Sequence, residues 1–98
     1  MVVWSDIARD QIDAIYEFIA SSSPAYARGV VDRIFRRGED IARFPLAGRL
    51  MPELGLKQIR EVIEGPYRII YHIGPDQIEV IAVFHGAQET PWTKPSSN

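Results

Sequence analysis

Apolar residues recur at helical spacing through the first half of the chain. After Ser5 they stand at positions 8, 12, 15, 16 and 19, which places them on one face of an α-helix. Ser5 and Asp6 are both favoured as helix N-caps, and the short apolar run Val2–Trp4 precedes them. The pattern therefore predicts an amphipathic helix that follows a short extended segment.

A second helical pattern begins at Ser23 and continues to about Phe44. Ser23 is the expected N-cap, and Pro24 suits the first helical position because its missing N–H would be unpaired there in any case. Pro45 ends the pattern, since the residue before a proline disfavours helical geometry. The link between the helices is so short that we expect an antiparallel hairpin.

The apolar period changes from about 3.6 to 2 in the second half of the chain. A segment rich in proline and glycine follows Phe44 and predicts a loop. Three strands are then expected, with turns at Gly65–Pro66 and at 74–77; they are Gln58–Ile63, Tyr67–Ile73 and Ile78–Phe84. The order β-α-α-β-β-β predicts an α+β domain, in which a helical hairpin packs on one face of a small antiparallel sheet.

Side chains alternate between the two faces of a strand, so the turn at 74–77 assigns the residues of the last two strands to faces. If Ile73 pairs with Ile78, one face is almost wholly apolar and should carry the helices: Tyr67, Ile69, Tyr71, Ile73, Ile78, Val80, Ala82 and Phe84. The other face is mixed: Arg68, Ile70, His72, Glu79, Ile81, Val83 and His85. A slip of one residue in the register would exchange the faces.

In this register Arg68 lies opposite Val83 and diagonal to His85, and His72 lies opposite Glu79. The mixed face is either a partly hydrated sheet surface or a surface that binds a ligand or another chain. Its three aliphatic residues favour the second interpretation, because a contiguous apolar patch is costly to expose to water.

Length and composition indicate the number of domains and the cellular environment of the protein. The 98 residues suffice for one domain, which we place at residues 1–92, and the polar residues 93–98 are expected to be a disordered tail. The chain has no cysteine, no apolar run of about 18 residues and no signal-peptide pattern. We therefore expect a soluble cytoplasmic protein that has no membrane contact and no disulfide or thiol chemistry.

Charge and motifs exclude several functions. The net charge is −2 and the pI is about 5.6, which argues against direct binding of nucleic acid. His72 and His85 fall on separate strands without a third ligand, so neither a metal nor a cofactor is expected. The arginines of the second helix are read as a solvated helix face: Arg33, Arg36, Arg37 and Arg43. Trp92 is either a docking anchor or a cover for the core.

Six short motifs, in order, resemble the RelE/ParE toxins of bacterial type II toxin–antitoxin systems. They are W-S-x-x-A-x-x-Q-I from Trp4, S-P-x-x-A from Ser23, F-P-x-x-G-R from Phe44, I-R-E from Ile59, Y-R-I-I-Y from Tyr67 and V-F-H-G-A from Val83. The resemblance covers nearly the whole chain. It implies a toxin held in a hetero-oligomer by a cognate antitoxin, whose C-terminal segment wraps the toxin as extended chain and helix.

The family resemblance implies two mechanisms. RelE-like members cleave mRNA on the ribosome, and ParE-like members lack that chemistry and inhibit DNA gyrase. Arg68 matches the arginine that contacts the scissile phosphate in the ribonuclease members, but Gln88 stands where their second arginine is expected and only Lys57 represents their lysines. Their C-terminal tyrosine has no clear counterpart. We therefore expect a gyrase inhibitor of the ParE type, with no catalytic residues.

Two alternatives stay open. A ribosome-dependent mRNA endonuclease would use Glu61 as base, Arg68 as electrostatic stabiliser and His85 as acid, which requires Glu61 and Arg68 to share a face. A relic without toxicity would only bind its antitoxin and co-repress their operon. In the gyrase-inhibitor reading, the candidates for contact with a partner protein are Arg60, Arg68, Ile70, Ile81, Val83, His85, Gln88 and Trp92.

Overall fold

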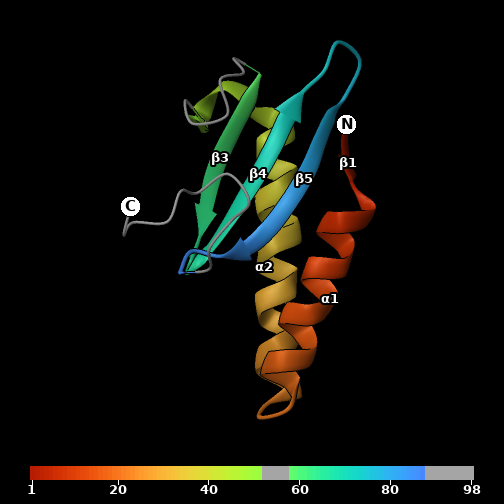
Figure 1. Cartoon of the computed structure of the whole chain (residues 1–98), viewed down its shortest axis with the longest axis vertical. Coiled ribbons are helices and arrows are strands. Elements are labelled where there is room, and N and C mark those ends of the chain that lie inside the picture. The colour runs from red at the N-terminus through yellow and green to blue at the C-terminus, as the bar shows by residue number, and fades with distance from the viewer. Residues whose placement is uncertain (52–57, 88–98) are drawn as a thin grey trace, which may run out of the picture.

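Two long helices cover one face of a five-stranded sheet (Figure 1). A computed structural model describes residues 1–51 and 58–87. In chain order the elements are β1 (Val2–Trp4), α1 (Asp6–Ala20), α2 (Pro24–Arg43), a 3-10 turn (Pro45–Ala47), β2 (Arg49–Leu50), β3 (Ile59–Glu64), β4 (Tyr67–Ile73) and β5 (Ile78–His85). This confirms the predicted α+β class and the β-α-α-β-β-β order, to which β2 adds a short strand in the segment predicted as a loop.

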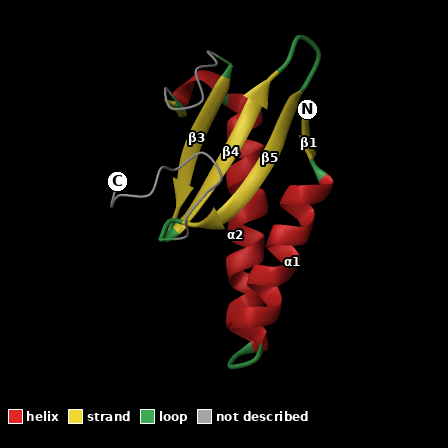
Figure 2. Cartoon of the chain, viewed as in Figure 1, coloured by secondary structure: helices red, strands yellow, loops and turns green. Residues whose placement is uncertain are grey.

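The sheet is mixed rather than purely antiparallel, which corrects the prediction. Its strand order is β1-β5-β4-β3-β2, and β1 runs parallel to β5 while the other pairs are antiparallel (Figure 2). The two turns of the sequence determine the direction of β3, β4 and β5 relative to one another. No turn connects β1 to β5, so the sequence pattern carries no information on how β1 is oriented.

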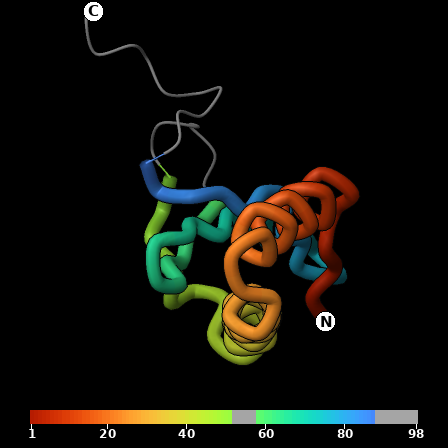
Figure 3. Tube along the Cα trace, turned by 90° about the horizontal axis from the view of Figure 1, so that it is seen from below, coloured from red at the N-terminus to blue at the C-terminus, as the bar shows by residue number. Residues whose placement is uncertain are grey.

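The helices begin where the capping residues predict. The Ser5 hydroxyl accepts a hydrogen bond from the Ala8 amide at 3.0 Å, and the Ser23 hydroxyl accepts one from the Tyr26 amide at 3.2 Å. Pro24 occupies the first turn of α2. The two helices form the expected hairpin, and the view in Figure 3 shows them side by side. Neither is long and apolar enough to cross a membrane, and no other helix in the described ranges is.

The main core lies between the helices and the sheet. Ala8, Ile34, Ile69, Tyr71 and Val80 are completely buried there. Burial of such side chains is the chief favourable contribution to folding, at about 1.5–3 kcal/mol for each large one. The helix-facing positions predicted for the N-terminal half of β5 and the whole of β4 are therefore correct.

A bulge at Ile81 makes the prediction wrong for the rest of β5. From the turn to the pair Tyr71–Val80 the register is as expected, but Ile70 then pairs with Ala82, and Arg68 pairs with Phe84. One inserted residue shifts every following side chain to the other face. Two residues predicted to face the helices, Ala82 and Phe84, lie on the far face, and two predicted for the far face, Val83 and His85, lie on the helix side.

The N-cap residue of α1 and a glutamine in its second turn bind β5 around this bulge. Beyond the end of β1, the Ser5 hydroxyl donates to the Ile81 carbonyl at 3.2 Å, and the Gln11 side-chain oxygen accepts from the Val83 amide at 2.6 Å. The Ser5 amide also donates to the Val80 carbonyl at 2.9 Å. The motif W-S-x-x-A-x-x-Q-I therefore supplies polar groups that bind the outer edge of β5 where no strand covers it.

A second apolar cluster lies on the sheet face turned away from the helices. Its buried members come from β3, from β4, from the part of β5 after the bulge and from the residue that follows β2: Met51, Ile59, Ile70, Ala82 and Phe84. Ile81 packs against them. The sheet is therefore apolar on both faces near its centre.

Trp4 requires a glycine on α2. Its ring packs against Gly38, where a β-carbon would overlap the indole, and it makes an edge-to-face contact with Phe35 at 4.7 Å between ring centroids. We expect Gly38→Ala to lower the free energy of unfolding by about 1–2 kcal/mol, because overpacking outweighs the better helix propensity of alanine. Chemical denaturation of the purified chain measures the change.

Gly29 is the matched control, since it lies in the same helix and a β-carbon there would meet only the end of the Arg33 side chain at 3.6 Å. Gly29→Ala should raise stability by up to about 1 kcal/mol. Equal effects of the two substitutions would contradict the packing of Trp4 on Gly38.

Candidate functional site

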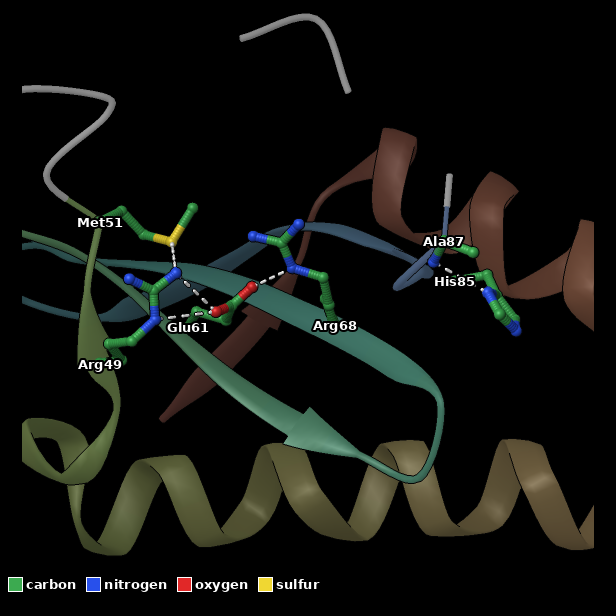
Figure 4. Close-up of polar contacts among 6 residues, drawn as sticks. All are labelled: Arg49, Met51, Glu61, Arg68, His85 and Ala87. Carbon is green, nitrogen blue, oxygen red and sulfur yellow. Dashed lines mark hydrogen bonds and ion pairs between the residues drawn. The ribbon is translucent and has the colours of Figure 1, made fainter. Parts of the chain in front are cut away.

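The Glu61 carboxylate lies between two arginines on the face away from the helices (Figure 4). One oxygen accepts hydrogen bonds from Arg49 Nη2 at 2.9 Å and from Arg49 Nε at 3.2 Å. The other accepts from Arg68 Nε in a close ion pair. The Glu61 side chain is only 5% exposed, whereas the Arg49 and Arg68 side chains are 55% and 20% exposed, so a buried carboxylate is paired with two arginines that reach the solvent. We call these three residues the glutamate–arginine cluster.

Strand register brings these residues together. Arg49 of β2 stands directly opposite Glu61 of β3, and Arg68 of β4 stands opposite Ile63, two residues along β3. The tight turn at Gly65 determines this register, and Gly65 has a positive φ of 58°, a conformation that glycine adopts without strain. Glu61 and Arg68 therefore share a face, which the sequence left open.

His85 does not join them. It stands opposite Tyr67 across the sheet, and the two rings make an edge-to-face contact at 5.6 Å between centroids on the helix side. Its Nδ1 accepts a hydrogen bond from the Ala87 amide at 3.0 Å. Figure 4 shows His85 apart from Glu61 and Arg68. The structure thus assembles two of the three residues that a ribonuclease site would need, with the third on the opposite face.

A clamp on residues 45–48 places Arg49 beside Glu61. The Tyr71 hydroxyl donates to the Pro45 carbonyl at 2.6 Å and accepts from the Gly48 amide at 3.2 Å. Arg60 donates to the carbonyls of Leu46 and Gly48 at 3.1 and 2.7 Å. A β-carbon on Gly48 would overlap the Tyr71 hydroxyl. The motif F-P-x-x-G-R is therefore held by Arg60 of I-R-E and Tyr71 of Y-R-I-I-Y, and Arg60 is engaged in this clamp.

The other candidates for partner contact differ in accessibility. Ile70 and Val83 are completely buried, so neither side chain offers surface to a partner in this conformation. Ile81 is partly exposed. Gln88 and Trp92 lie outside the described residues, as does the tail at 93–98. Within 1–51 and 58–87, no group of three or more acidic or histidine side chains could hold a metal ion.

An apolar groove of about 460 Å³ lies on the other side of the sheet, between α1 and the ends of β4 and β5. Phe18 projects beside it with 82% of its surface exposed, and His85 lines its wall. Sequence reasoning missed both Phe18 and Arg49. An outward phenylalanine near the end of an amphipathic helix was the available signal for the first, and the arginine of F-P-x-x-G-R was the signal for the second.

Removal of the Glu61 carboxylate should destabilise the fold. Glu61→Ala leaves Arg49 and Arg68 close together without a counter-charge, and we expect a loss of about 1–3 kcal/mol in the free energy of unfolding. Glu61→Gln keeps a hydrogen-bond acceptor and should lose less. Urea denaturation of both variants tests the order, and equal stability of Glu61→Ala and the unchanged chain would contradict the cluster.

Tyr71→Phe tests the clamp. The substitution removes one hydroxyl and leaves the partly buried Pro45 carbonyl and the buried Gly48 amide without their partner, so stability should fall by about 1–3 kcal/mol. Burial raises the pKa of Tyr71 above its ordinary value near 10, although the Gly48 amide and two arginines oppose the shift. The folded state therefore retains the proton longer than the unfolded chain, and stability should decline as the pH rises above about 10. This decline should be smaller in Tyr71→Phe; an identical alkaline decline in both proteins would contradict the assignment.

Comparisons with known proteins agree with this architecture. The family described as the ParE toxin of type II toxin–antitoxin systems, parDE, matches residues 2–90. The chain is 32% identical over 90 residues to the putative toxin Y4kP of Sinorhizobium fredii, covering 90% of each protein. It is 28% identical over 88 residues to the toxin RelE2 of Caulobacter vibrioides, covering 89% of this chain and 96% of that toxin.

Two solved structures share the fold. A chain of the chromosomal ParDE system of P. aeruginosa superposes with a TM-score of 0.71 at 18% identity, covering 86% of this chain and 92% of that one. A chain of the toxin–antitoxin complex RelBE2 of Mycobacterium tuberculosis superposes with a TM-score of 0.60 at 23% identity, covering 87% and 95%. With the family match over nearly its full length, this chain belongs to the RelE/ParE family and is a toxin of the type II toxin–antitoxin class.

Proposed function

We propose that this chain is a ParE-like toxin that inhibits DNA gyrase by binding and is neutralised by a cognate antitoxin. The observation that carries the proposal is the separation of His85 from Glu61 and Arg68 by the thickness of the sheet. Cleavage of RNA requires a base and an acid that reach the two oxygens of one phosphate. Side chains on opposite faces of a sheet do not meet this requirement.

The state of Glu61 supports the same reading. Both of its oxygens already accept hydrogen bonds from arginine side chains, and the carboxylate is nearly inaccessible to water. A general base must reach the hydroxyl proton that it removes, so a carboxylate occupied in this way is poorly placed for the task. Here it serves as the counter-charge for two arginines.

The proposal that an antitoxin binds this chain rests on the solved structures that share its fold. The ParDE and RelBE2 structures come from toxin–antitoxin systems, and their toxin folds cover most of this chain. A cytoplasmic hetero-oligomer is the corresponding proposal here. Of the candidates for contact with the antitoxin or gyrase, Arg68, Ile81 and His85 remain accessible in the described structure, and Gln88 and Trp92 stay candidates from the sequence alone.

One observation favours the second candidate, an mRNA endonuclease of the RelE type. Glu61 and Arg68 do share a face and are in direct contact, as that mechanism requires. The name RelE2 of the Caulobacter relative belongs to the same alternative. The two functions differ in the cellular process that stops first, so they are separable in living cells.

Induction of the chain alone in a bacterium should stop DNA synthesis before protein synthesis. Pulse-labelling with thymidine and methionine follows both processes, and purified chain should then inhibit supercoiling by gyrase in vitro. His85→Ala should leave DNA synthesis as the process that stops first, because no proton transfer is involved; a weaker arrest in the same order would mark His85 as a contact with gyrase. Co-expression of the antitoxin encoded beside the toxin should restore growth.

Earlier arrest of protein synthesis, with relief by both His85→Ala and Arg68→Ala at unchanged protein levels, would establish the endonuclease instead. The absence of any growth arrest from a chain that folds and binds its antitoxin would identify a relic.

A further inference from the structure

Arg68 is held in one orientation by two contacts. Its Nε donates to Glu61, and its guanidinium lies over the Phe84 ring at 5.1 Å from the centroid. Its side chain is 20% exposed. Within residues 1–51 and 58–87, neither terminal nitrogen of Arg68 has a hydrogen-bond partner, and Figure 4 shows both directed away from the sheet.

The backbone beside the Arg68 side chain is fixed. Gly86 lies next to that side chain, where a β-carbon would come within 3.8 Å of the Arg68 Cγ and Cδ atoms. The Gly86 amide is fastened to the Pro66 carbonyl at 2.7 Å, so the backbone at this point is fixed. A guanidinium that is already ordered loses little conformational entropy when it binds, which makes Arg68 a preorganised donor pair.

We propose that the two terminal nitrogens of Arg68 bind a carboxylate of the antitoxin, as the polar anchor of the antitoxin segment that crosses this face of the sheet. The inference rests on the proposed function, since it takes the antitoxin as the partner. A guanidinium presents two parallel N–H groups that match the two oxygens of a carboxylate. Glu61 is then a positioning residue, which holds the guanidinium plane but does not touch the partner.

Charge favours an acidic peptide over RNA. The glutamate–arginine cluster carries two positive charges and one negative charge, which leaves one positive charge for a single anion. The far face as a whole is balanced in its described part, because Glu79 offsets that charge. A nucleic-acid strand binds through several phosphates and needs a net positive surface.

The apolar surroundings fit a peptide as well. Ile63 is the cross-strand neighbour of Arg68 and is 52% exposed. A peptide that places an acidic side chain on Arg68 can cover Ile63 with an apolar side chain of its own, a combination that a phosphodiester backbone does not offer.

The test is a binding measurement between the purified chain and the antitoxin by isothermal titration calorimetry. We expect Arg68→Gln to weaken the complex about 10- to 100-fold, and Arg68→Lys to weaken it by a similar factor because the charge remains but the paired donors are lost. Arg36→Gln removes an exposed arginine of α2 and should leave the affinity unchanged. Circular dichroism melts confirm that each variant is folded.

The antitoxin supplies the second half of the test. Each Asp and Glu of its toxin-binding segment is changed to Asn or Gln. One of these changes should weaken binding as much as Arg68→Gln does and add nothing further in combination with it. Full affinity of folded Arg68→Gln, or the absence of any acidic residue coupled to Arg68, would overturn the inference while the proposed function stands.

Two other outcomes also overturn it. Failure of the unchanged chain to bind the antitoxin would refute the proposed function and the inference together. Competition with the antitoxin by a short single-stranded RNA, lost in Arg68→Gln, would assign the donor pair to a phosphate and favour the endonuclease.

Discussion

The hydroxyl of Ser5 reaches the carbonyl of Ile81, the one residue of β5 that β4 leaves unpaired, and much of the molecule depends on this contact. Because strand side chains alternate, an unpaired residue decides which later side chains meet the helices. Val83 joins the main core and Phe84 lies under Arg68 only because Ile81 is skipped. The same hydroxyl caps α1, so the helix start and the strand register are specified together.

The position of Arg49 depends on contacts between three motifs that are distant in the sequence. The Tyr71 hydroxyl and the Arg60 guanidinium hold the carbonyls and amide of residues 45–48, and β2 follows directly. Arg49 consequently meets Glu61 although twelve positions separate them in the chain. The cluster of charges on the far face is thus supported by polar contacts made on the helix side, at the edge of the same sheet.

Sequence reasoning identified most of the fold because its signals are local. Ser23 followed by Pro24 starts a helix, and the glycines at 65 and 74 mark the turns that set the strand directions. The parallel alignment of β1 depends on pairing between residues 2–4 and residues 78–80. The bulge at Ile81 depends on a serine 76 positions away. No local sequence pattern predicts the alignment of β1 or the bulge at Ile81.

The residues of the site also divide into those with a local sequence signal and those placed by distant contacts. Glu61 and Arg68 were paired as a condition of one mechanism, and the two-residue turn met that condition. His85 was placed on the wrong face because the bulge was invisible in the sequence, and Arg49 was overlooked because a loop was expected where β2 forms. The sequence motifs contain the residues of the site, but the strand register determines which of those residues come into contact.

Strand β4 occupies the middle of the sheet, with β3 and β5 on either side and buried side chains above and below it: Ile69 and Tyr71 toward the helices, Ile70 toward the far face. Opening β4 requires both apolar layers and both neighbouring ladders to separate at once. Amide hydrogens of this strand will therefore exchange with solvent only through global unfolding, while the short edge strands β1 and β2 exchange through local fraying. We therefore expect Arg68, carried by β4, to keep its position through the local openings of β1 and β2.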